Sequence, residues 1–338
     1  MAKEKKGRKI IILLIIFLLS IIISFQIGRY PIGPIELVKI LISRVIEIPQ
    51  TWSDQAETVV FNIRLPRVIL SFIIGSSLAL SGLLLQQVFN NPMASQDVLG
   101  SASASAFGAS LALLTGAGYF AVSISAFLFG ILSLLLIIGI SSKIKKQDTL
   151  TLILSGIMVS SLFSSATSFI KLVADTEDTL PAITYFLMGS LSSFRSSDLI
   201  LVFTVAIAAS LPILLISWRI NLLSLSEEEA KSMGVNTAML RLASIGAATL
   251  LTAASVACSG QIGWVGLVIP HFSRMIVGSN TRESIPAAML LGASFLTVVD
   301  TIARSISTSE IPLGILTSFV GAPFFLYLII RESKKHEY

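Results

Sequence analysis

The feature that most constrains this chain is a series of apolar runs, each about twenty residues long, that recur from one end of the sequence to the other. The hydrocarbon core of a bilayer is about 30 Å thick, so a helix rising 1.5 Å per residue crosses it in about 20 residues. Hydrophobic residues make up 54% of the chain and charged residues 13%, and the mean hydropathy is +0.87. Membrane β-strands would alternate apolar and polar residues, whereas these runs are continuous. We therefore predict an all-α integral membrane protein.

Ten runs are long enough to cross a membrane, and polar or glycine-rich segments separate them. The predicted spans cover residues 10–29, 67–88, 97–116, 119–141, 149–171, 196–218, 239–258, 261–278, 286–304 and 312–330. The third and eighth are the weakest, because they are rich in Gly, Ser and Ala or contain Pro270. The basic N-terminus and first run also resemble a signal peptide, but no small-residue cleavage pattern follows them, so we expect a retained first span.

The basic residues indicate how the spans are oriented. If the N-terminus is cytoplasmic, the cytoplasmic segments hold 16 of the 24 Lys and Arg residues, as the positive-inside rule requires. An even number of spans then places the C-terminus on the same side. We expect one polytopic transmembrane domain over residues 1–338, with cytoplasmic tails 1–9 and 331–338, an outer loop 30–66 and a cytoplasmic segment 219–238.

The chain shows no motif for hydrolytic catalysis, for a phosphate-binding loop or for a metal site built from Cys and His. One cysteine, Cys258, and two histidines, His271 and His336, provide neither a disulfide framework nor a metal cage. There is no phosphate-binding G-x-x-x-x-G-K-[ST] loop, no G-x-S-x-G elbow and no H-E-x-x-H pair. The net charge of +5 is explained by basic residues flanking the spans rather than by nucleic-acid binding. We expect a non-enzyme without cofactor or bound metal; an intramembrane hydrolase would have to recruit a serine with His271.

A glycine-rich stretch, SGQIGWVGLVIPH, interrupts the apolar pattern in the first half of the eighth span. Gly260, Gly263 and Gly266 leave the backbone little side-chain cover, and Pro270 removes a hydrogen-bond donor. Irregular backbone at membrane depth persists only where it is buried in protein or lines a water-filled cavity. These four residues therefore indicate a translocation pathway.

Small residues recur at helical spacing in two other spans. Gly100, Ala104 and Gly108 share one helical face, and Gly75 with Ala79 repeats the spacing. Such faces let helix backbones approach closely in a membrane. We favour helix packing over a ligand-binding role for both.

The cytoplasmic segment between the sixth and seventh spans contains signals for a short helix. Ser226 and Glu229 form a capping box, Glu227 suits the positive end of a helix, and Gly234 suits a C-terminal cap. Four apolar residues in this segment are available for a partner: Leu223, Leu225, Ala230 and Met233. The alternative is a solvated connector, although a connector would not need the caps.

Charges within the predicted spans are few. Asp300 and Arg304 lie four residues apart and are expected to pair with each other. Carriers driven by ion gradients usually contain more such groups, although a secondary carrier stays an alternative. Arg64 and Arg67 face outward on the predicted topology, against the positive-inside rule.

Five stretches together resemble the permease subunits of ATP-binding-cassette importers for iron-siderophores, haem and vitamin B12. They are residues 64–67 (RLPR), 81–110 (SGLLLQQVFNNPMASQDVLGSASASAFGAS), 223–236 (LSLSEEEAKSMGVN), 260–278 (GQIGWVGLVIPHFSRMIVG) and 300–329 (DTIARSISTSEIPLGILTSFVGAPFFLYLI). The resemblance runs from about residue 10 to residue 331. It implies the type II importer fold, in which two permeases of ten spans surround a central pathway, two ATPase subunits bind at the cytoplasmic side and a substrate-binding protein docks outside.

The resemblance also implies roles for individual residues. It assigns docking of the binding protein to Arg64, Arg67 and Arg304, whose guanidinium groups would pair with carboxylates; lipid-phosphate contact or capping of local carbonyls is the alternative. It assigns ATPase coupling to Leu225, Ser226, Glu227, Glu229, Ala230, Met233 and Gly234. It places an inner gate at Thr149 and Leu150, although Leu150 departs from the small hydroxyl residue expected of a vitamin B12 permease.

The sequence therefore predicts a permease for a metal chelate, with a ferric siderophore as the favoured cargo. Cobalamin, haem and oxyanions remain open, because a separate binding protein would select the ligand. The expected partners are a second copy of the chain or a closely related permease, two ATPase subunits, the binding protein and the lipid bilayer.

Overall fold

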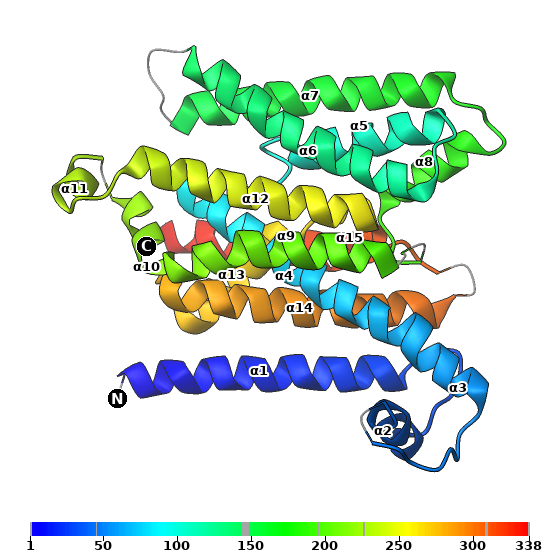
Figure 1. The fold of residues 1–338 in the computed structure, drawn as a ribbon. Coiled ribbons are helices and arrows are strands. Elements are labelled where there is room, and N and C mark those ends of the chain that lie inside the picture. The colour runs from blue at the N-terminus through cyan, green and yellow to red at the C-terminus, as the bar shows by residue number, and fades with distance from the viewer. Residues whose placement is uncertain are drawn as a thin grey trace.

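The computed structural model describes residues 2–44, 46–143, 149–192, 194, 196–225, 227–307 and 310–336, and this part of the chain is helical without a strand. The helices are α1 (Ala2–Gln26), α2 (Pro34–Ile42), α3 (Asp54–Thr58), the π-helix η1 (Val59–Arg64), α4 (Leu65–Val88), α5 (Ser101–Leu114), α6 (Tyr119–Ser142), α7 (Thr149–Val173), α8 (Thr179–Met188), α9 (Ser196–Leu215), α10 (Ser217–Ile220), the 3-10 helix η2 (Asn221–Ser224), α11 (Glu227–Ser232), α12 (Thr237–Ser259), α13 (Val265–Val277), α14 (Thr281–Ile306) and α15 (Leu313–His336). Both termini lie at the same end of the bundle (Figure 1), which we call the terminus end; the other is the far end.

Each of the ten predicted spans corresponds to a helix of the structure: α1, α4, α5, α6, α7, α9, α12, α13, α14 and α15. Within the described residues, seven helical stretches are long and apolar enough to cross a membrane. The two spans that the sequence marked as weakest form α5 and α13, which have 14 and 13 residues. The prediction of an all-α membrane protein is confirmed.

The segment before α4 is more helical than the sequence indicated. We expected a loop over residues 30–66, but it contains α2, α3 and η1, and α3, η1 and α4 follow one another without a break. Ser53 caps α3 by accepting a hydrogen bond from the Ala56 amide at 3.1 Å. The side chains of Leu37, Trp52 and Val60 pack in a small apolar cluster with Phe25 of α1. Burial of these side chains explains why this outer segment is ordered.

Helix α8 was also unexpected. It begins within the acidic stretch at residues 174–181, which we expected to be a loop. Ile183 of α8 is buried in a cluster with Ile170 of α7 and with Ala174, the residue that follows α7. The apolar run in this helix is too short for the sequence to predict a membrane-spanning helix here.

Helix α4 is the central element of the bundle, in contact with α9, α12, α13 and α14. Its glycines permit this packing: a methyl group on Gly75 would lie 2.2 Å from the Gly292 carbonyl oxygen, and one on Gly82 would lie 1.8 Å from that of Gly266. Ala79 also faces Gly292. The helix-packing interpretation of Gly75 and Ala79 is therefore confirmed.

The small residues of α5 contact two different helices. Gly100 is the N-cap residue of α5 with φ of 67°, and it packs against the backbone of Ser160 in α7. Gly108 packs against the Ser125 carbonyl of α6. These glycines serve helix packing, as predicted.

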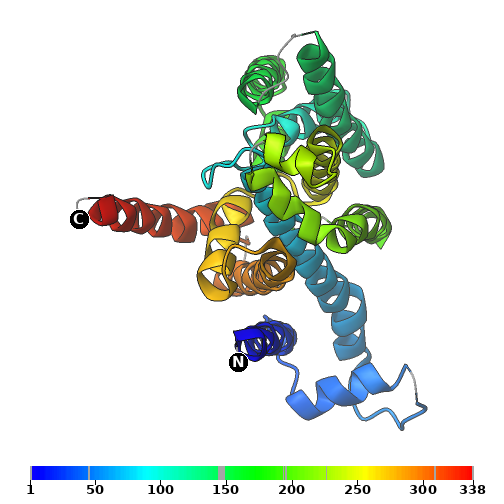
Figure 2. The ribbon, with the colours of Figure 1, turned by 90° about the vertical axis from the view of Figure 1, so that its left-hand side faces the viewer.

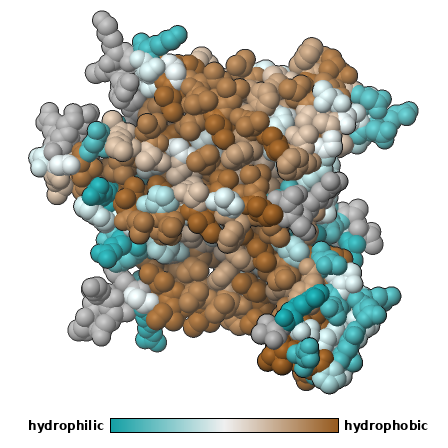
Figure 3. Space-filling view, in the orientation of Figure 1, coloured by the Kyte–Doolittle hydropathy of each residue, from teal (hydrophilic) through white to brown (hydrophobic). Residues whose placement is uncertain are grey.

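The surface is consistent with a membrane environment. Apolar residues cover the middle of the face in Figure 3, and hydrophilic residues gather towards its two ends. Helix α15 projects away from the other helices (Figure 2), and Phe319, Val320 and Leu326 on it are exposed. An apolar helix in this position faces either lipid or another protein.

Candidate functional site

The backbone is broken between α12 and α13, as the glycine-rich stretch predicted. Helix α12 ends at Ser259, Gly260 has φ of 66°, and Trp264 has φ of 71°. A methyl group on Gly260 would lie 1.9 Å from the Phe186 carbonyl oxygen, so both the positive φ and the lack of space require glycine there. The break thus places non-helical backbone inside the helix bundle.

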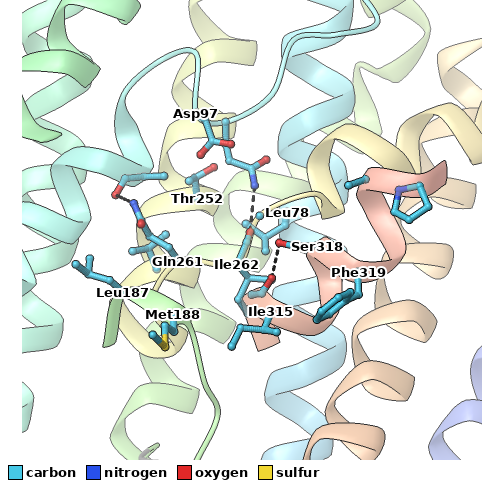
Figure 4. Close-up of a pocket in the computed structure, with 17 residues that line it drawn as sticks. Leu78, Asp97, Leu187, Met188, Thr252, Gln261, Ile262, Ile315, Ser318 and Phe319 are labelled. Atoms are coloured by element: carbon cyan, nitrogen blue, oxygen red, sulfur yellow. Dashed lines mark hydrogen bonds between the residues drawn. The ribbon is translucent and has the colours of Figure 1, made fainter. Parts of the chain in front are cut away.

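A cavity of about 740 Å³ lies beside this break. Figure 4 shows its walls, which come from α4, the loop after α4, α5, α8, α12, the break itself and α15. Its lining residues are Leu78, Gln96, Asp97, Ala102, Leu187, Met188, Thr252, Val256, Gln261, Ile262, Gly263, Gly314, Ile315, Ser318, Phe319, Ala322 and Pro323. The walls are mainly apolar, with a few polar groups.

Hydrogen bonds hold the polar parts of this lining in place. The Gln96 amide nitrogen donates to the Ile262 carbonyl at 3.4 Å, and the Gln261 amide nitrogen donates to the Ala102 carbonyl at 3.2 Å. The first bond satisfies a carbonyl of the break, which has no helical partner, and the second ties the break to α5. The cavity wall is therefore built across segments far apart in the sequence.

The four pathway residues predicted from the sequence lie in different positions. Gly263 lines the cavity. Gly266 does not; it lies against α4 and the side-chain oxygen of Gln96, which a methyl group there would meet at 2.0 Å. Gly260 and Pro270 are likewise outside the lining, and Pro270 is buried within α13. His271 packs edge-on against the Phe324 ring of α15.

The gate residues Thr149 and Leu150 begin α7. Neither is among the residues lining the cavity. The Leu150 side chain is exposed, and the Thr149 side chain lies outside the described part of the structure. The gate assignment stays a prediction.

Two of the three predicted docking arginines hold the far end of α1. Arg64 donates to the Phe25 and Tyr30 carbonyls, at 2.5 Å each, and Arg304 donates to the Ser24 carbonyl and to its hydroxyl. The last carbonyls of a helix lack partners within the helix and carry partial negative charge, so cations stabilise them. These contacts correspond to the capping alternative raised from the sequence.

The third arginine, Arg67, forms the shortest ion pair among the described residues, with Asp300. Arg67 donates to Asp300 from Nε at 2.9 Å and from Nη2 at 2.8 Å, and its Nη1 lies 2.9 Å from Glu310. The expected pair of Asp300 with Arg304 is longer, at 3.8 Å. Arg67 is therefore the principal partner of Asp300, because its bidentate fork approaches from α4 across the helix interface.

All three arginines are almost completely covered by the chain itself. Exposed fractions are 2% for Arg64, 5% for Arg67 and 9% for Arg304. The structure thus gives each of them partners within the chain. Their contact with a binding protein stays a prediction.

The predicted coupling segment forms α10, η2 and α11 at the terminus end. Gly234 has φ of 73°, and the Val235 amide donates to the Ala230 carbonyl at 3.2 Å, the bond that closes a glycine-capped helix end. The C-terminal cap is therefore confirmed. Ser226 lies outside the described residues, as does the side chain of Glu227, whereas the Glu229 carbonyl accepts from the Met233 amide at 3.3 Å.

The apolar side chains of this segment separate into two groups. Leu223 and Ala230 are buried. Leu225 is 38% exposed and Met233 is 63% exposed. Only the second pair is available on the surface of this chain for a partner.

One asparagine connects the coupling segment to α14. The Asn221 side chain accepts from the Thr281 amide at 2.8 Å and donates to Asn280 at 3.1 Å. Asn280 is the N-cap of α14, where it accepts from the Arg282 amide at 3.0 Å. These hydrogen bonds link η2 of the coupling segment to the start of α14.

Sequence reasoning missed several residues of the site. Asp97 was predicted to begin the third span and Gln96 to lie just before it, but both precede α5 and line the cavity. The helix-breaking NNP stretch before them was the available signal. Among the residues that the structure describes, no group of three or more His, Cys, Asp or Glu side chains is arranged to hold a metal.

Comparisons with known proteins agree with this architecture. The model of the FecCD transport family matches residues 13–331. The molybdate import system permease protein MolB of Haemophilus influenzae is 40% identical over 319 residues, 94% of this chain and 94% of that protein. A Helicobacter pylori protein named as an iron chelatin transport system permease is 37% identical over 273 residues, 81% of this chain and 82% of that protein.

A solved structure extends the comparison to three dimensions. It is described as an inward-facing conformation of a metal-chelate type ABC transporter, and it superposes with a TM-score of 0.86 at 39% identity over 96% of this chain and 99% of that chain. Sequence and fold thus match over nearly the whole length. The chain belongs to the FecCD transport family of membrane permeases.

Proposed function

We propose that this chain is the transmembrane subunit of an ATP-driven importer that carries a metal chelate, with a ferric siderophore as the cargo, through the cytoplasmic membrane. The observation that carries the proposal is the cavity of about 740 Å³ beside broken backbone, inside a bundle of membrane-length helices. Such backbone is tolerated at membrane depth where it lines an aqueous path. The relative named for iron chelatin supports the cargo class, and cobalamin, haem and oxyanions are the alternatives.

The terminus end is proposed to face the cytoplasm. It carries Lys9, Lys143, Arg219 and Arg282, from four different segments of the chain. This arrangement follows the positive-inside rule. ATP hydrolysis would then occur in separate subunits bound at this end, since the chain has no nucleotide-binding loop of its own.

A second copy of the chain, or a closely related permease, is proposed to complete the path. Helix α15 lines the cavity and projects from the bundle (Figure 2), so a partner there would close the cavity from the open side. Exposed serines also follow one face of α7, at residues 161, 164, 165 and 168. Hydroxyl groups gain more from a partner or an aqueous path than from lipid.

Import by the assembled complex tests the proposed function. In vesicles that contain the permease, its ATPase and the binding protein, we expect ATP-dependent uptake of a radiolabelled ferric siderophore. Uptake should be lost when either partner is omitted and should persist with an ionophore, which would abolish a gradient-driven carrier. Import that needs neither partner would refute the proposal, and uptake restricted to a different chelate would refute the cargo assignment alone.

Coupling is proposed to depend on the exposed pair Leu225 and Met233. We expect a Leu225→Glu/Met233→Glu variant to lose most of the import rate, because two charges would have to be desolvated against the ATPase surface. Binding of the ATPase subunits to the permease in detergent, measured by co-purification, should fall in parallel. Ser142→Glu is the matched control, since Ser142 is exposed at the end of α6. Equal losses in both variants would contradict the assignment.

A further inference from the structure

The cavity lining contains a single ionisable side chain. Of the residues that form the described wall, only Asp97 titrates; the others are apolar or neutral, and none is Lys, Arg or His. Asp97 is exposed, and its carboxylate accepts a hydrogen bond from the Ser95 hydroxyl at 3.4 Å. No ion pair to Asp97 is found among the described residues. Its negative charge is therefore uncompensated within the wall.

An unpaired carboxylate in the wall of a cavity attracts cations and repels anions that enter the cavity. Low-dielectric walls focus the field of a charge into the space that they enclose. Leu78, Ile262 and Phe319 are apolar parts of the same lining (Figure 4). If two copies of the chain surround the path, two-fold symmetry brings a second Asp97 to it and doubles the charge.

We infer that Asp97 makes this cavity selective for neutral or cationic cargo and unfavourable for anions such as oxyanions. The inference rests on the proposed function, in which the cavity is part of an import path, and it narrows the class of cargo. It implies that this chain does not carry molybdate, although a relative named for molybdate import is 40% identical. Sequence identity over the whole chain indicates a shared fold, whereas the charge of the cavity lining decides which ions are repelled.

The effect of the Asp97 charge can be measured without transport, from the rates at which charged reagents modify a cysteine in the cavity wall. Cys258 is buried, so a Cys258→Ala chain offers a background in which Ser318→Cys places one thiol in the cavity wall. The rate of its modification by a cationic methanethiosulfonate reagent is compared with that by an anionic one, with Asp97 intact and with Asp97→Asn. For a reagent charge about 10 Å from the carboxylate in water, Coulomb's law changes this rate ratio about fourfold, and more at lower dielectric.

At low ionic strength, where the carboxylate is little screened, we expect the ratio of cationic to anionic rates to fall about fourfold or more in Asp97→Asn and to stay high in Asp97→Glu. Thr51→Cys, an exposed site outside the cavity lining, is the control, and its ratio should be the same in all three backgrounds. A ratio at residue 318 that Asp97→Asn leaves unchanged would overturn the inference. A thiol at residue 318 that reacts with neither reagent would overturn it as well, because the cavity would then be closed to water.

Uptake in vesicles gives the second measurement. The importer assembled with its ATPase and binding protein should take up radiolabelled molybdate no faster than vesicles without permease, and faster uptake would overturn the inference. The two failures are distinguishable. A shifted rate ratio without ATP-dependent siderophore import would refute the proposed function alone, whereas import with an unshifted ratio would refute the role of Asp97 alone.

Discussion

Replacing Arg67 with methionine should lower the free energy of unfolding by about 3–5 kcal/mol, the usual cost of removing one partner of a buried ion pair. Asp300 is completely buried, and Arg67 donates two of its hydrogen bonds to it. Without the guanidinium, the ion pair with Arg304 at 3.8 Å is the one that the carboxylate keeps within the described part of the chain. The free energy can be measured by denaturant titration of the purified chain in mixed micelles.

The double variant Arg67→Met/Asp300→Asn is the control for this prediction. It removes the buried negative charge together with its partner, so it should recover most of the lost stability. Glu310, the other partner of Arg67, has 24% of its side chain exposed and can turn to water. A double variant as unstable as the single one would show that Arg67 stabilises the fold through packing rather than through its charge.

The same two variants distinguish an effect of Arg67 on binding-protein docking from its effect on the stability of the fold. A loss of binding-protein affinity in Arg67→Met alone would be ambiguous, because the far end of the chain would be disturbed. The folded double variant lacks the guanidinium, so it should bind the binding protein more weakly at low salt if Arg67 contacts a carboxylate of that protein. Unchanged affinity in the double variant would count against the docking role.

Replacing Gly82 with alanine should cost about 3 kcal/mol or more, at the upper end of what overpacking a core usually costs. The new methyl group would lie 1.8 Å from the Gly266 carbonyl oxygen, which belongs to the backbone of α13 and cannot rotate away. Helices α4 and α13 would have to separate, and the hydrogen bond from Gln86 to the Leu267 carbonyl, 3.2 Å long, would stretch. The same titration in micelles measures the change.

Gly139→Ala provides the matched control. Gly139 lies within helix α6, is exposed and has no atom within 4 Å of the added methyl group. Alanine is the better helix former by about 1 kcal/mol, so this variant should be neutral or slightly more stable. If Gly82→Ala were as well tolerated as Gly139→Ala, the close approach of α4 to α13 would not be essential to the fold.

Features carried by contiguous residues could be predicted from the sequence. The ten spans could be predicted from the lengths of the apolar runs, because a helix needs about 20 apolar residues to cross the hydrocarbon core of a bilayer. The break at Gly260 and the cap at Gly234 follow from backbone conformations that few residues other than glycine adopt, and the structure has both with positive φ. The short helices at residues 34–42, 54–58, 59–64 and 179–188 were missed, because short helices depend on burial against neighbours rather than on their own length.

Features that join distant residues were decided by the tertiary structure. Arg67 and Asp300 are 233 positions apart, and nothing in the spacing of either one indicates the other, whereas Arg304 at a helical spacing from Asp300 looked like its partner. Asp97 became a cavity residue only because the loop after α4 folds back beside the break after α12. Hydrophobic length and local backbone preference determine which segments are helices, but the choice of neighbouring helices depends on packing and on the pairing of buried charges, which are properties of the assembled bundle.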